Sequence, residues 1–389
     1  MNILIVTSSI SQGGITQFAV NLANYLAENN IVTLAYTTID NQSAYKKISE
    51  KIRCVSYCAA SQKKMMLSVI RHGWIIHALK IKFRNHKKVS PIKSIQRIQY
   101  ARAEQTQLPI ELKKHFDIAI STAEFFCNNL VAMNIEADKK IAWIHPDYKA
   151  LKTDVEFDRK LLETFDAVAV VSKTNCNNMK EMLPSIKDRI VHIPNLMDFR
   201  NIEELAKEKP AEYGQTKGIR IITVCRLDNS SKRVDRIVEI CRCLKEKKVE
   251  FQWYVVGDGG DRRKIEELIK KRNVQSCLTL LGGKENPYPY IKFADVFILT
   301  SQYEGRPIAV DEALILGCPV IVTNYASAKE QVDPRWGAIV ENDDKKCIDE
   351  MVQLLSSNKI VKWKEKIIDC DLENDIIKEF KNSISKYVL

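Results

Sequence analysis

The chain has 389 residues, of which 45% are hydrophobic and 28% charged, and its formal net charge is +11. This composition is typical of a globular protein with room for two domains, and it excludes a largely disordered chain. No stretch approaches about 18 uncharged apolar residues, so we expect no transmembrane helix, and eleven cysteines without a CxxC pair indicate the reduced thiols of a cytoplasmic protein.

The first half of the chain alternates apolar runs with amphipathic segments. NILIVTS at residues 2–8 reads as a buried parallel strand, a Gly-rich turn follows, and FAVNLANYLAENN has helical periodicity before the strand IVTLAYTT. This β-loop-α-β order predicts a parallel α/β sheet. Four further strands are expected in FDIAISTA (116–123), KIAWIH (140–145), FDAVAVVS (165–172) and RIVHIPN (189–195).

A basic, mostly helical insertion near 62–114 interrupts this order. Residues 63–114 hold 13 Lys and Arg but two acids, with apolar residues such as Trp74 and Ile76 between them. This mixture suits contact with an anionic membrane surface or an anionic acceptor, and a solvated helical insertion is the alternative. Nucleic acid is not expected as a partner, because no RNA- or DNA-binding motif accompanies the charge.

The second half repeats the same alternation after a polar segment at 196–217. Its expected strands are GIRIITVCRL (218–227), EFQWYVVGDG (250–259), SCLTLLGG (276–283), VFILTS (296–301), PVIVTN (319–324) and GAIVEN (337–342). We therefore predict an α/β fold of two Rossmann-like domains facing a central cleft, with ligands at the carboxyl ends of the strands. The predicted boundaries are 1–196 for the first domain, 197–365 for the second and 366–389 for a C-terminal helix.

Two glutamates, Glu304 and Glu312, lie on either side of a predicted helix start that follows the strand at 296–301. The N-terminus of that helix offers the free N–H groups of Ile308 and Ala309 to an anion. The side chain of Glu312 leans back toward the same end. Both carboxylates could therefore bind the hydroxyls of a sugar or ribose at one edge, although spacing alone equally allows a surface acid and a helix-start charge without a ligand.

Two cations, a histidine and a glycine pair also lie at predicted strand ends or helix starts. Arg226 ends one strand and Lys232 starts the next helix, so the two could clamp a diphosphate or simply be solvated. His145 ends a parallel strand, where ligands bind, although a core histidine is the alternative. Gly13 and Gly14 follow the first strand and allow either close approach of a ligand to the backbone or an ordinary turn.

Taken together, these segments resemble the family 4 retaining glycosyltransferases, and especially bacterial members that build capsule, O-antigen or exopolysaccharide. The resemblance covers nearly the whole chain and is most specific from about 218 to 341. It departs from the family pattern at Arg306-Pro307, where Arg306 could contact a charged donor group or face solvent. The motifs that carry it are EGRPIAVDEALILGCPVIVTN, CRLDNSSKR and VVGDG, and more loosely GGITQFAVNLANYL, WIHPDY, AVVSKTNCNN and IPNLMD.

The resemblance implies a GT-B fold whose C-terminal helix, 366–389, crosses back to the first domain. It also implies roles for individual residues around a nucleotide-sugar donor. Arg226 and Lys232 would hold the diphosphate, together with the backbone of Ile308 and Ala309. Glu312 would bind the ribose diol, Glu304 the sugar hydroxyls, and the backbone of Leu281 and Gly282 the base. Gly14 would approach the diphosphate or the acceptor, and His145 would contact the sugar near its reacting carbon.

The activity that the resemblance implies is retaining, metal-independent transfer of a hexose or N-acetylhexosamine. The donor would be a nucleotide-diphosphate sugar, by family habit a UDP-sugar, and no cofactor is expected. The acceptor would be a saccharide or an undecaprenyl-diphosphate-linked oligosaccharide at the inner face of the cell membrane. A nucleotide-sugar 2-epimerase-like enzyme and a non-catalytic nucleotide-sugar-binding partner of another transferase remain as alternatives.

Overall fold

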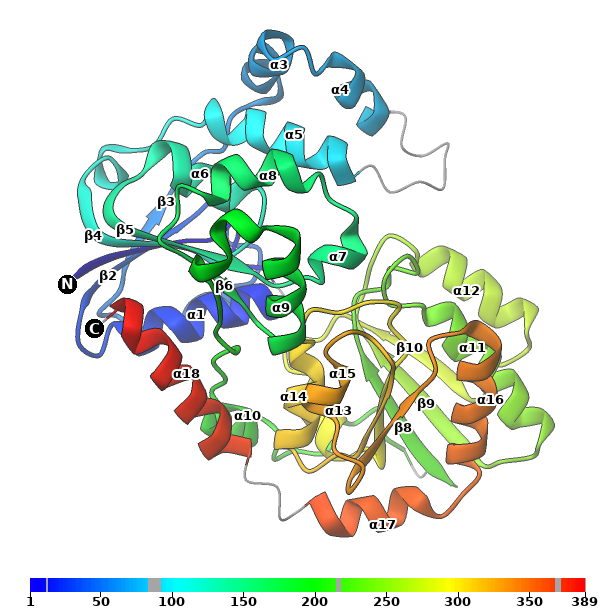
Figure 1. Cartoon of the computed structure of the whole chain (residues 1–389). Helices are drawn as coiled ribbons and strands as arrows, with labels where there is room; N and C mark the ends of the chain where they lie inside the picture. The colour runs from blue at the N-terminus through cyan, green and yellow to red at the C-terminus, as the bar shows by residue number, and fades with distance from the viewer. Residues whose placement is uncertain (12, 83–91, 215–217, 368–371, 389) are drawn as a thin grey trace. The chain divides into compact units, whose positions relative to one another are not determined.

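The structure is a computed structural model, and it describes residues 1–11, 13–82, 92–214, 218–367 and 372–388 (Figure 1). The chain divides into two compact units. Unit 1 comprises Met1–Met197 together with Lys378–Leu389, and unit 2 comprises Asp198–Ile377. Each contains one sheet whose paired strands are all parallel, so the predicted fold class of two Rossmann-like α/β domains is confirmed.

Unit 1 is built on a seven-stranded sheet of order β3-β2-β1-β4-β5-β6-β7. Register pairs Val6 with Ser121 and Ser121 with Ala142, so β1, β4 and β5 end side by side at one edge. The strands are β1 (Asn2–Val6), β2 (Ile31–Tyr36), β3 (Arg53–Ser56), β4 (His115–Ser121), β5 (Glu136–Ile144), β6 (Ala167–Val170) and β7 (Ile190–His192).

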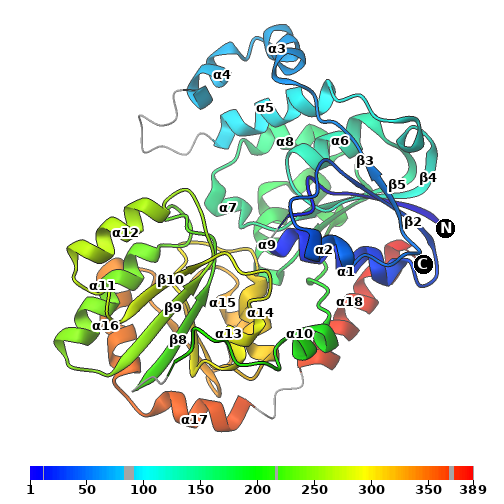
Figure 2. The same ribbon diagram turned by 180° about the vertical axis from the view of Figure 1, so that it is seen from behind.

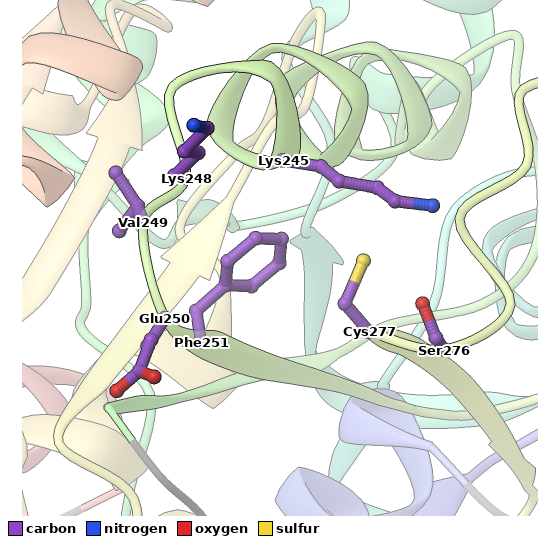
Figure 3. A pocket seen from close by; sticks show the side chains of 7 residues that line it. All are labelled: Lys245, Lys248, Val249, Glu250, Phe251, Ser276 and Cys277. Carbon is purple, nitrogen blue, oxygen red and sulfur yellow. The ribbon is translucent and has the colours of Figure 1, made fainter.

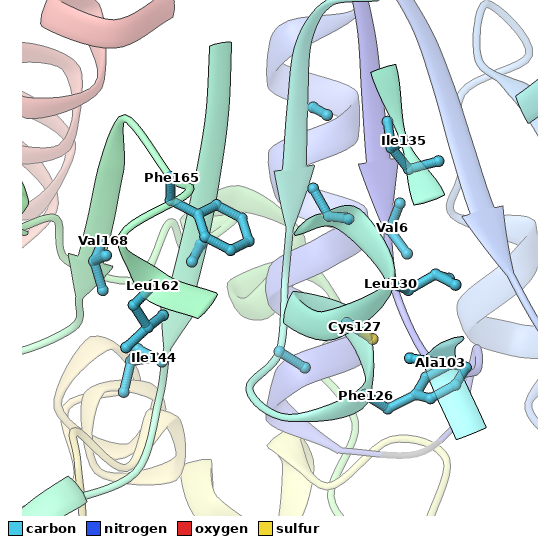
Figure 4. Close-up of a cluster of buried hydrophobic side chains, with 14 of the residues drawn as sticks. Val6, Ala103, Phe126, Cys127, Leu130, Ile135, Ile144, Leu162, Phe165 and Val168 are labelled. Carbon is cyan, nitrogen blue, oxygen red and sulfur yellow. The ribbon is translucent and has the colours of Figure 1, made fainter. Parts of the chain in front are cut away.

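Helices cover both faces of this sheet. On one face α1 (Gly14–Leu26) places Phe18 against Trp143 of β5, with ring centroids 4.8 Å apart. The opposite face carries a cluster that includes Val6, and Figure 4 shows side chains of α6 (Phe126–Asn134) within it. Outside the basic insertion and the C-terminal helix, the other helical elements of unit 1 are α2 (Gln42–Lys46), η2 (Ile110–Leu112), α7 (Tyr148–Leu151), α8 (Val155–Leu162), α9 (Lys173–Met182) and η3 (Pro184–Arg189).

The basic insertion forms three helices, α3 (Gln62–Arg71), α4 (Ile75–Lys82) and α5 (Ile92–Glu104). Polar contacts join these helices to one another and to the rest of unit 1. Glu104 pairs with Arg71 at 3.1 Å, and Arg97 donates to Asp154 at 2.6 Å. Part of the predicted insertion, 83–91, lies outside the described residues. Among the residues that are described, no helix is long and apolar enough to cross a membrane.

The C-terminal helix α18 (Leu372–Val388) contributes its last residues to unit 1. Glu379 lies 2.7 Å from the Lys173 ammonium and 3.5 Å from the His192 ring. Phe380 is fully buried, with its ring edge-on to Tyr25 at 5.5 Å between centroids. An apolar anchor and an ionic contact therefore hold this end of the chain within the first unit.

Unit 2 has a six-stranded sheet of order β10-β9-β8-β11-β12-β13. Figure 2, which turns the molecule to its reverse side, shows its helices on both faces. The strands are β8 (Ile219–Val224), β9 (Phe251–Val256), β10 (Leu278–Gly282), β11 (Val296–Leu299), β12 (Val320–Thr323) and β13 (Gly337–Val340). The helices are α10 (Phe199–Leu205), α11 (Val234–Glu246), α12 (Arg262–Lys271), α13 (Tyr288–Lys292), α14 (Ile308–Ile315), α15 (Ala328–Gln331), α16 (Asp344–Leu355) and α17 (Lys359–Lys366).

Candidate functional site

The loops that follow β8 and β11 meet at the carboxyl edge of the unit 2 sheet, because these two strands are neighbours. There the Lys232 ammonium forms an ion pair and hydrogen bond with Glu304 Oε1. The Ser301 hydroxyl donates to the same oxygen at 2.6 Å. The side chains of Lys232 and Glu304 are 20% and 11% exposed, so water screens their contact only partly. The structure thus brings Lys232, which is predicted to bind the diphosphate, into direct contact with Glu304, which is predicted to bind the sugar hydroxyls.

The loop that carries Lys232 folds around Asp228. Its carboxylate accepts hydrogen bonds from the backbone and hydroxyl of Ser230, at 3.0 and 2.6 Å, and from the hydroxyl of Ser231 at 3.0 Å. The N–H of Lys232 donates to the carbonyl of Asp228 at 2.7 Å. Burial alone would raise the pKa of Asp228, but these serine hydrogen bonds and the Arg226 charge lower it overall. The loop therefore holds its shape through an ionised aspartate.

Arg226 is the more exposed of the two cations predicted to bind the diphosphate. Its side chain is 68% exposed, and its guanidinium lies 3.7 Å from Asp228. A bidentate guanidinium suits a phosphate, and an exposed one can reorient toward an incoming anion at small cost. Lys232 is thus positioned before any ligand arrives, whereas Arg226 is available at the rim.

Helix α14 begins at Ile308, shortly after Glu304, which contacts Lys232. Its N-cap is Pro307, and no side chain caps the N-terminus, so the amides of Ile308 and Ala309 are not taken up by a capping side chain. Such an end carries the partial positive charge of the helix dipole. Glu312, 6% exposed, lies one turn further along the same helix. The predicted pairing of a helix N-terminus with Glu312 is therefore present in unit 2.

Arg306 neither faces solvent nor stands free for a ligand. Its guanidinium makes two hydrogen bonds to Asp311, at 3.0 and 3.1 Å, and the two side chains are 10% and 1% exposed. Gln331 adds a third hydrogen bond to Asp311 at 3.0 Å and one to the Pro307 carbonyl at 3.2 Å. This network braces the turn between Glu304 and α14. Asp311 was not predicted from the sequence, because the two residues are not at a helical spacing.

Glycines bring the neighbouring loops close to each other. A Cβ on Gly257, which has φ +139°, would lie 1.8 Å from the carbonyl oxygen of Cys225. The N–H of Gly257 donates to the carbonyl of Gly282 at 2.8 Å. The VVGDG motif is thus explained by packing of the loops after β8, β9 and β10. Leu281, predicted to offer its backbone to a base, is a half-buried residue near the end of β10.

Two predicted site residues belong to unit 1. Gly14 starts α1 directly after Gly13, which has φ +146° and caps that helix. His145 follows β5 and donates from Nε2 to the Thr122 carbonyl at 3.0 Å. Burial lowers the pKa of His145 to about 4, against a smaller opposing effect of the Thr122 contact. The ring is therefore neutral near pH 7, and Nδ1 is left as a hydrogen-bond acceptor.

A cavity of about 320 Å³ lies elsewhere in unit 2 and is separate from this site. It opens at the amino end of β9, whereas ligands of such sheets bind at the carboxyl ends. Figure 3 shows Lys245 and Lys248 on its helical side and Phe251 and Cys277 on its strand side. Within the described residues, His, Cys, Asp and Glu form no group of three or more that could hold a metal ion.

Comparison with known proteins relates this arrangement to sugar transfer. Residues 206–369 match the family model described as glycosyl transferases group 1. An uncharacterized glycosyltransferase of Methanocaldococcus jannaschii is 28% identical over 171 residues, which is 43% of this chain and 42% of that protein. Poly(ribitol-phosphate) alpha-N-acetylglucosaminyltransferase of Staphylococcus aureus is 23% identical over 238 residues, 57% of this chain and 48% of that protein. The alignments span less than half the length of both relatives.

Solved structures match over almost the full chain. HepE of Anabaena, solved in complex with UDP, has a TM-score of 0.68 at 12% identity and covers 99% of both chains. Staphylococcus aureus TarM, in a complex that includes UDP, has a TM-score of 0.66 at 13% identity and covers 98% of this chain and 99% of that one. At such identities the likeness establishes the fold. The family match at residues 206–369 and the glycosyltransferase relatives confirm the resemblance predicted from the sequence.

Proposed function

Because the segment at 206–369 belongs to the glycosyl transferases group 1 family, we propose that the chain is a retaining glycosyltransferase. It moves a hexose or N-acetylhexosamine from a nucleotide-diphosphate sugar, with UDP favoured as the nucleotide. The observation that carries the proposal is the Lys232–Glu304 pair at the carboxyl edge of unit 2, beside the uncapped N-terminus of α14. Cations and amides in such a place stabilise the negative charge of a departing diphosphate.

In the proposed reaction, the bond between the anomeric carbon and the phosphate oxygen breaks first. Lys232, Arg226 and the amides of Ile308 and Ala309 stabilise the diphosphate as its charge grows. The acceptor hydroxyl then bonds to the anomeric carbon from the same face, and its proton passes to the leaving phosphate oxygen. The reaction assigns no role to a metal ion, so transfer should persist in a chelator.

Glu304 has two tasks in this scheme. Without donor it holds Lys232 and accepts from Ser301, which keeps the cation at the edge where the phosphate binds. With donor present, its carboxylate can also accept hydrogen bonds from sugar hydroxyls, because each carboxylate offers about four lone-pair sites. Glu312 is assigned to the ribose diol and the Leu281–Gly282 backbone to the base.

Unit 1 supplies the other assignments. His145 presents a neutral ring that can accept a hydrogen bond at Nδ1, and we assign it to the donor sugar near the reacting carbon. Gly14 starts α1 and is assigned to the diphosphate or the acceptor. The acceptor is a saccharide or an undecaprenyl-diphosphate-linked oligosaccharide used in surface polysaccharide synthesis. In support, a Campylobacter jejuni relative named as an N-acetylgalactosaminyltransferase acting on a diphospho-undecaprenol substrate is 26% identical over 181 residues.

The basic insertion supports a membrane-linked acceptor. Five of the nine large apolar side chains exposed in the described part of the chain lie in α3 and α4: Leu67, Ile70, Ile75, Ile76 and Leu79. Exposed lysines, such as Lys63 and Lys64, lie on the same short helices. Apolar side chains among cations suit the interface of an anionic bilayer. We therefore propose peripheral contact with the inner membrane face through this insertion.

A screen of nucleotide sugars tests the function directly. A cognate donor should raise the melting temperature, and incubation with saccharide or prenyl-diphosphate-linked acceptors plus EDTA should yield a product with the donor's anomeric configuration, read by proton NMR. Epimerisation of the donor without any acceptor would instead establish the epimerase alternative. Binding of nucleotide sugars without turnover under all of these conditions would establish the non-catalytic partner.

A further inference from the structure

A cleft of about 570 Å³ lies in unit 1, and no residue that lines it is assigned to the proposed reaction. Its lining comes from α9, η3, β7 and the C-terminal helix α18. Because β7 is the last strand in the sheet order, the cleft lies along a lateral edge of the sheet. Its place therefore differs from that of Gly14 and His145, which follow β1 and β5. The volume is within the range in which proteins hold small molecules.

Three lysines from separate elements line this cleft: Lys180 of α9, Lys187 of η3 and Lys386 of α18. Within the residues that the structure describes, none of their ammonium groups forms an ion pair or a hydrogen bond. Lys173, at the start of α9, by contrast pairs with Glu379 at 2.7 Å. This lysine cleft therefore collects cations that the folded chain does not pair with its own acids.

The charge of the lysine cleft suits an anion. Asp188 supplies the one carboxylate among the described lining residues, so three ammonium groups against one carboxylate give a formal charge of +2. Like charges that line a concave surface repel one another, and they raise the local concentration of counterions. A bound anion with two or more negative charges removes this repulsion.

The lining side chains favour a phosphate group over a carboxylate. A lysine ammonium binds phosphate as a point charge, whereas a planar carboxylate is matched best by the fork of an arginine, and no arginine is among the described lining residues. The hydroxyls of Ser383 and Tyr387 line the same cleft, and a hydroxyl can donate a hydrogen bond to a phosphate oxygen. The cleft is larger than a phosphate group alone, so it leaves room for a sugar or another small substituent.

We infer that the lysine cleft binds a phosphate-bearing anion and that this ligand holds the C-terminal helix against unit 1. The chain passes from unit 2 to unit 1 between Ile377 and Lys378, within α18. Lys386 belongs to α18, whereas Lys180 and Lys187 belong to α9 and η3, so one bound phosphate contacts both sides and stabilises the docked helix. A soluble sugar phosphate and a lipid headgroup share this chemistry. The inference stands apart from sugar transfer, in which the lining residues take no part.

Calorimetric titration of the full chain with glucose 6-phosphate tests the inference, with excess UDP present to occupy the candidate donor site. The double variant Lys187→Ala/Lys386→Ala should bind at least about tenfold more weakly than the wild type. Its melting temperature should be unchanged, because both lysines are exposed. Lys378→Ala/Lys381→Ala is the matched control, since it removes the same charge from exposed positions of α18 outside the cleft, and it should bind as the wild type does.

Hydrogen exchange of the same proteins locates the effect without any need for turnover, so it decides the cleft even if the chain transfers no sugar. Glucose 6-phosphate should slow amide exchange in α18 of the wild type and the control, but not in the cleft variant. Tighter binding of a short-chain phosphatidic acid than of glucose 6-phosphate would identify a lipid headgroup as the source of the phosphate, and the reverse order a soluble sugar phosphate. The inference is overturned if the wild type binds neither compound, if the cleft variant binds as the wild type does, or if both double variants weaken binding equally, which indicates only general attraction of anions.

Discussion

Arg306 and Asp311 form a buried bidentate ion pair that joins the turn after Glu304 to helix α14. Nε and Nη2 of the arginine lie 3.0 and 3.1 Å from the two carboxylate oxygens. Asp311 is 1% exposed, so its charge is balanced by the arginine and by the hydrogen bond from Gln331 rather than by water. The pair therefore sets the position of the helix N-terminus on which the proposed phosphate site depends.

Replacing Arg306 by alanine should lower the free energy of unfolding by about 3–5 kcal/mol, because it leaves the carboxylate of Asp311 buried without its cation. Urea denaturation of the full chain measures this change. Arg263→Ala is the control: that arginine is 91% exposed in its pair with Glu267, and its loss should cost less than about 1 kcal/mol. Equal stabilities of the two variants would show that the buried pair does not brace the turn.

The strands of this fold were largely predictable, since parallel strands buried on both faces appear as continuous apolar runs. VFILTS thus predicted β11 (Val296–Leu299). The short edge strand β3, with sequence RCVS and an exposed or half-buried side chain at three of its four positions, was missed because it lacks such a run. A short polar strand that is buried on one face has no continuous apolar run by which to predict it.

The site was predictable in part. Strand ends and helix starts placed Lys232 and Glu304 at one edge, but their contact depends on β8 and β11 being neighbours, which sequence order does not state. The role of Arg306 was open, and its partner Asp311 was missed, because a buried pair five residues apart follows from the path of the turn. The lysine cleft of unit 1 carried no motif either, because its lysines come from α9, η3 and α18 and meet only in the folded chain.

Removing the Lys232 ammonium should slow turnover far more than it disturbs folding. For Lys232→Ala we expect kcat to fall on the order of 10²–10³-fold, the usual effect of losing one preorganised group that stabilises charge in the transition state. Arg226→Ala should also reduce kcat, with no change in melting temperature, because Arg226 is 68% exposed. Steady-state kinetics with the cognate donor provide the measurement.

Lys207→Ala serves as the matched control, since Lys207 pairs with Glu204 on an exposed surface, at 65% and 68% exposure. Its kcat should equal that of the wild type. Wild-type turnover in a folded Lys232→Ala protein would remove the lysine from the proposed stabilisation of the leaving diphosphate.

The proposed contact between Glu312 and the ribose can be tested with a nucleotide that lacks the ribose hydroxyls. Wild-type protein is expected to bind UDP at least about tenfold more tightly than 2′,3′-dideoxy-UDP, because a hydrogen bond to a charged group contributes about 1.5–3 kcal/mol. In Glu312→Ala this preference should disappear, while the affinity for the dideoxy nucleotide stays the same. Calorimetric titration of the wild type and the variant, each with UDP and with the dideoxy nucleotide, isolates the contribution of this contact to the binding free energy. A preference for UDP that survives in the variant would remove the ribose assignment.

His145 should make the stability of the chain depend on pH in the acidic range. Burial lowers its pKa to about 4 in the folded protein, below the ordinary value of about 6.5. The unfolded chain therefore binds the proton first, so this contribution to stability is present above pH 6.5 and is lost as the pH falls toward 4. Between pH 7 and pH 5 the loss should be at most about 2 kcal/mol.

Urea denaturation of wild type and His145→Gln at both pH values checks this, because the difference between the proteins cancels all other titrating groups. The variant should lose less stability on acidification than the wild type. Identical losses would show that the His145 ring is protonated in the folded protein near pH 5, which would contradict its proposed role as a neutral acceptor of a hydrogen bond.

The insertion helices should mediate binding to anionic vesicles. We expect the wild type to sediment with phosphatidylglycerol-containing vesicles at low salt and less at high salt, where the charges are screened. Ile76, 65% exposed in α4, should contribute apolar burial worth about 1.5–3 kcal/mol, so Ile76→Glu should weaken binding about tenfold or more. Val361→Glu is the matched control, because Val361 is 63% exposed in α17 of unit 2 and should leave binding unchanged. Equal weakening by both variants would indicate a general effect of added negative charge, and failure of the wild type to bind at low salt would favour a soluble acceptor.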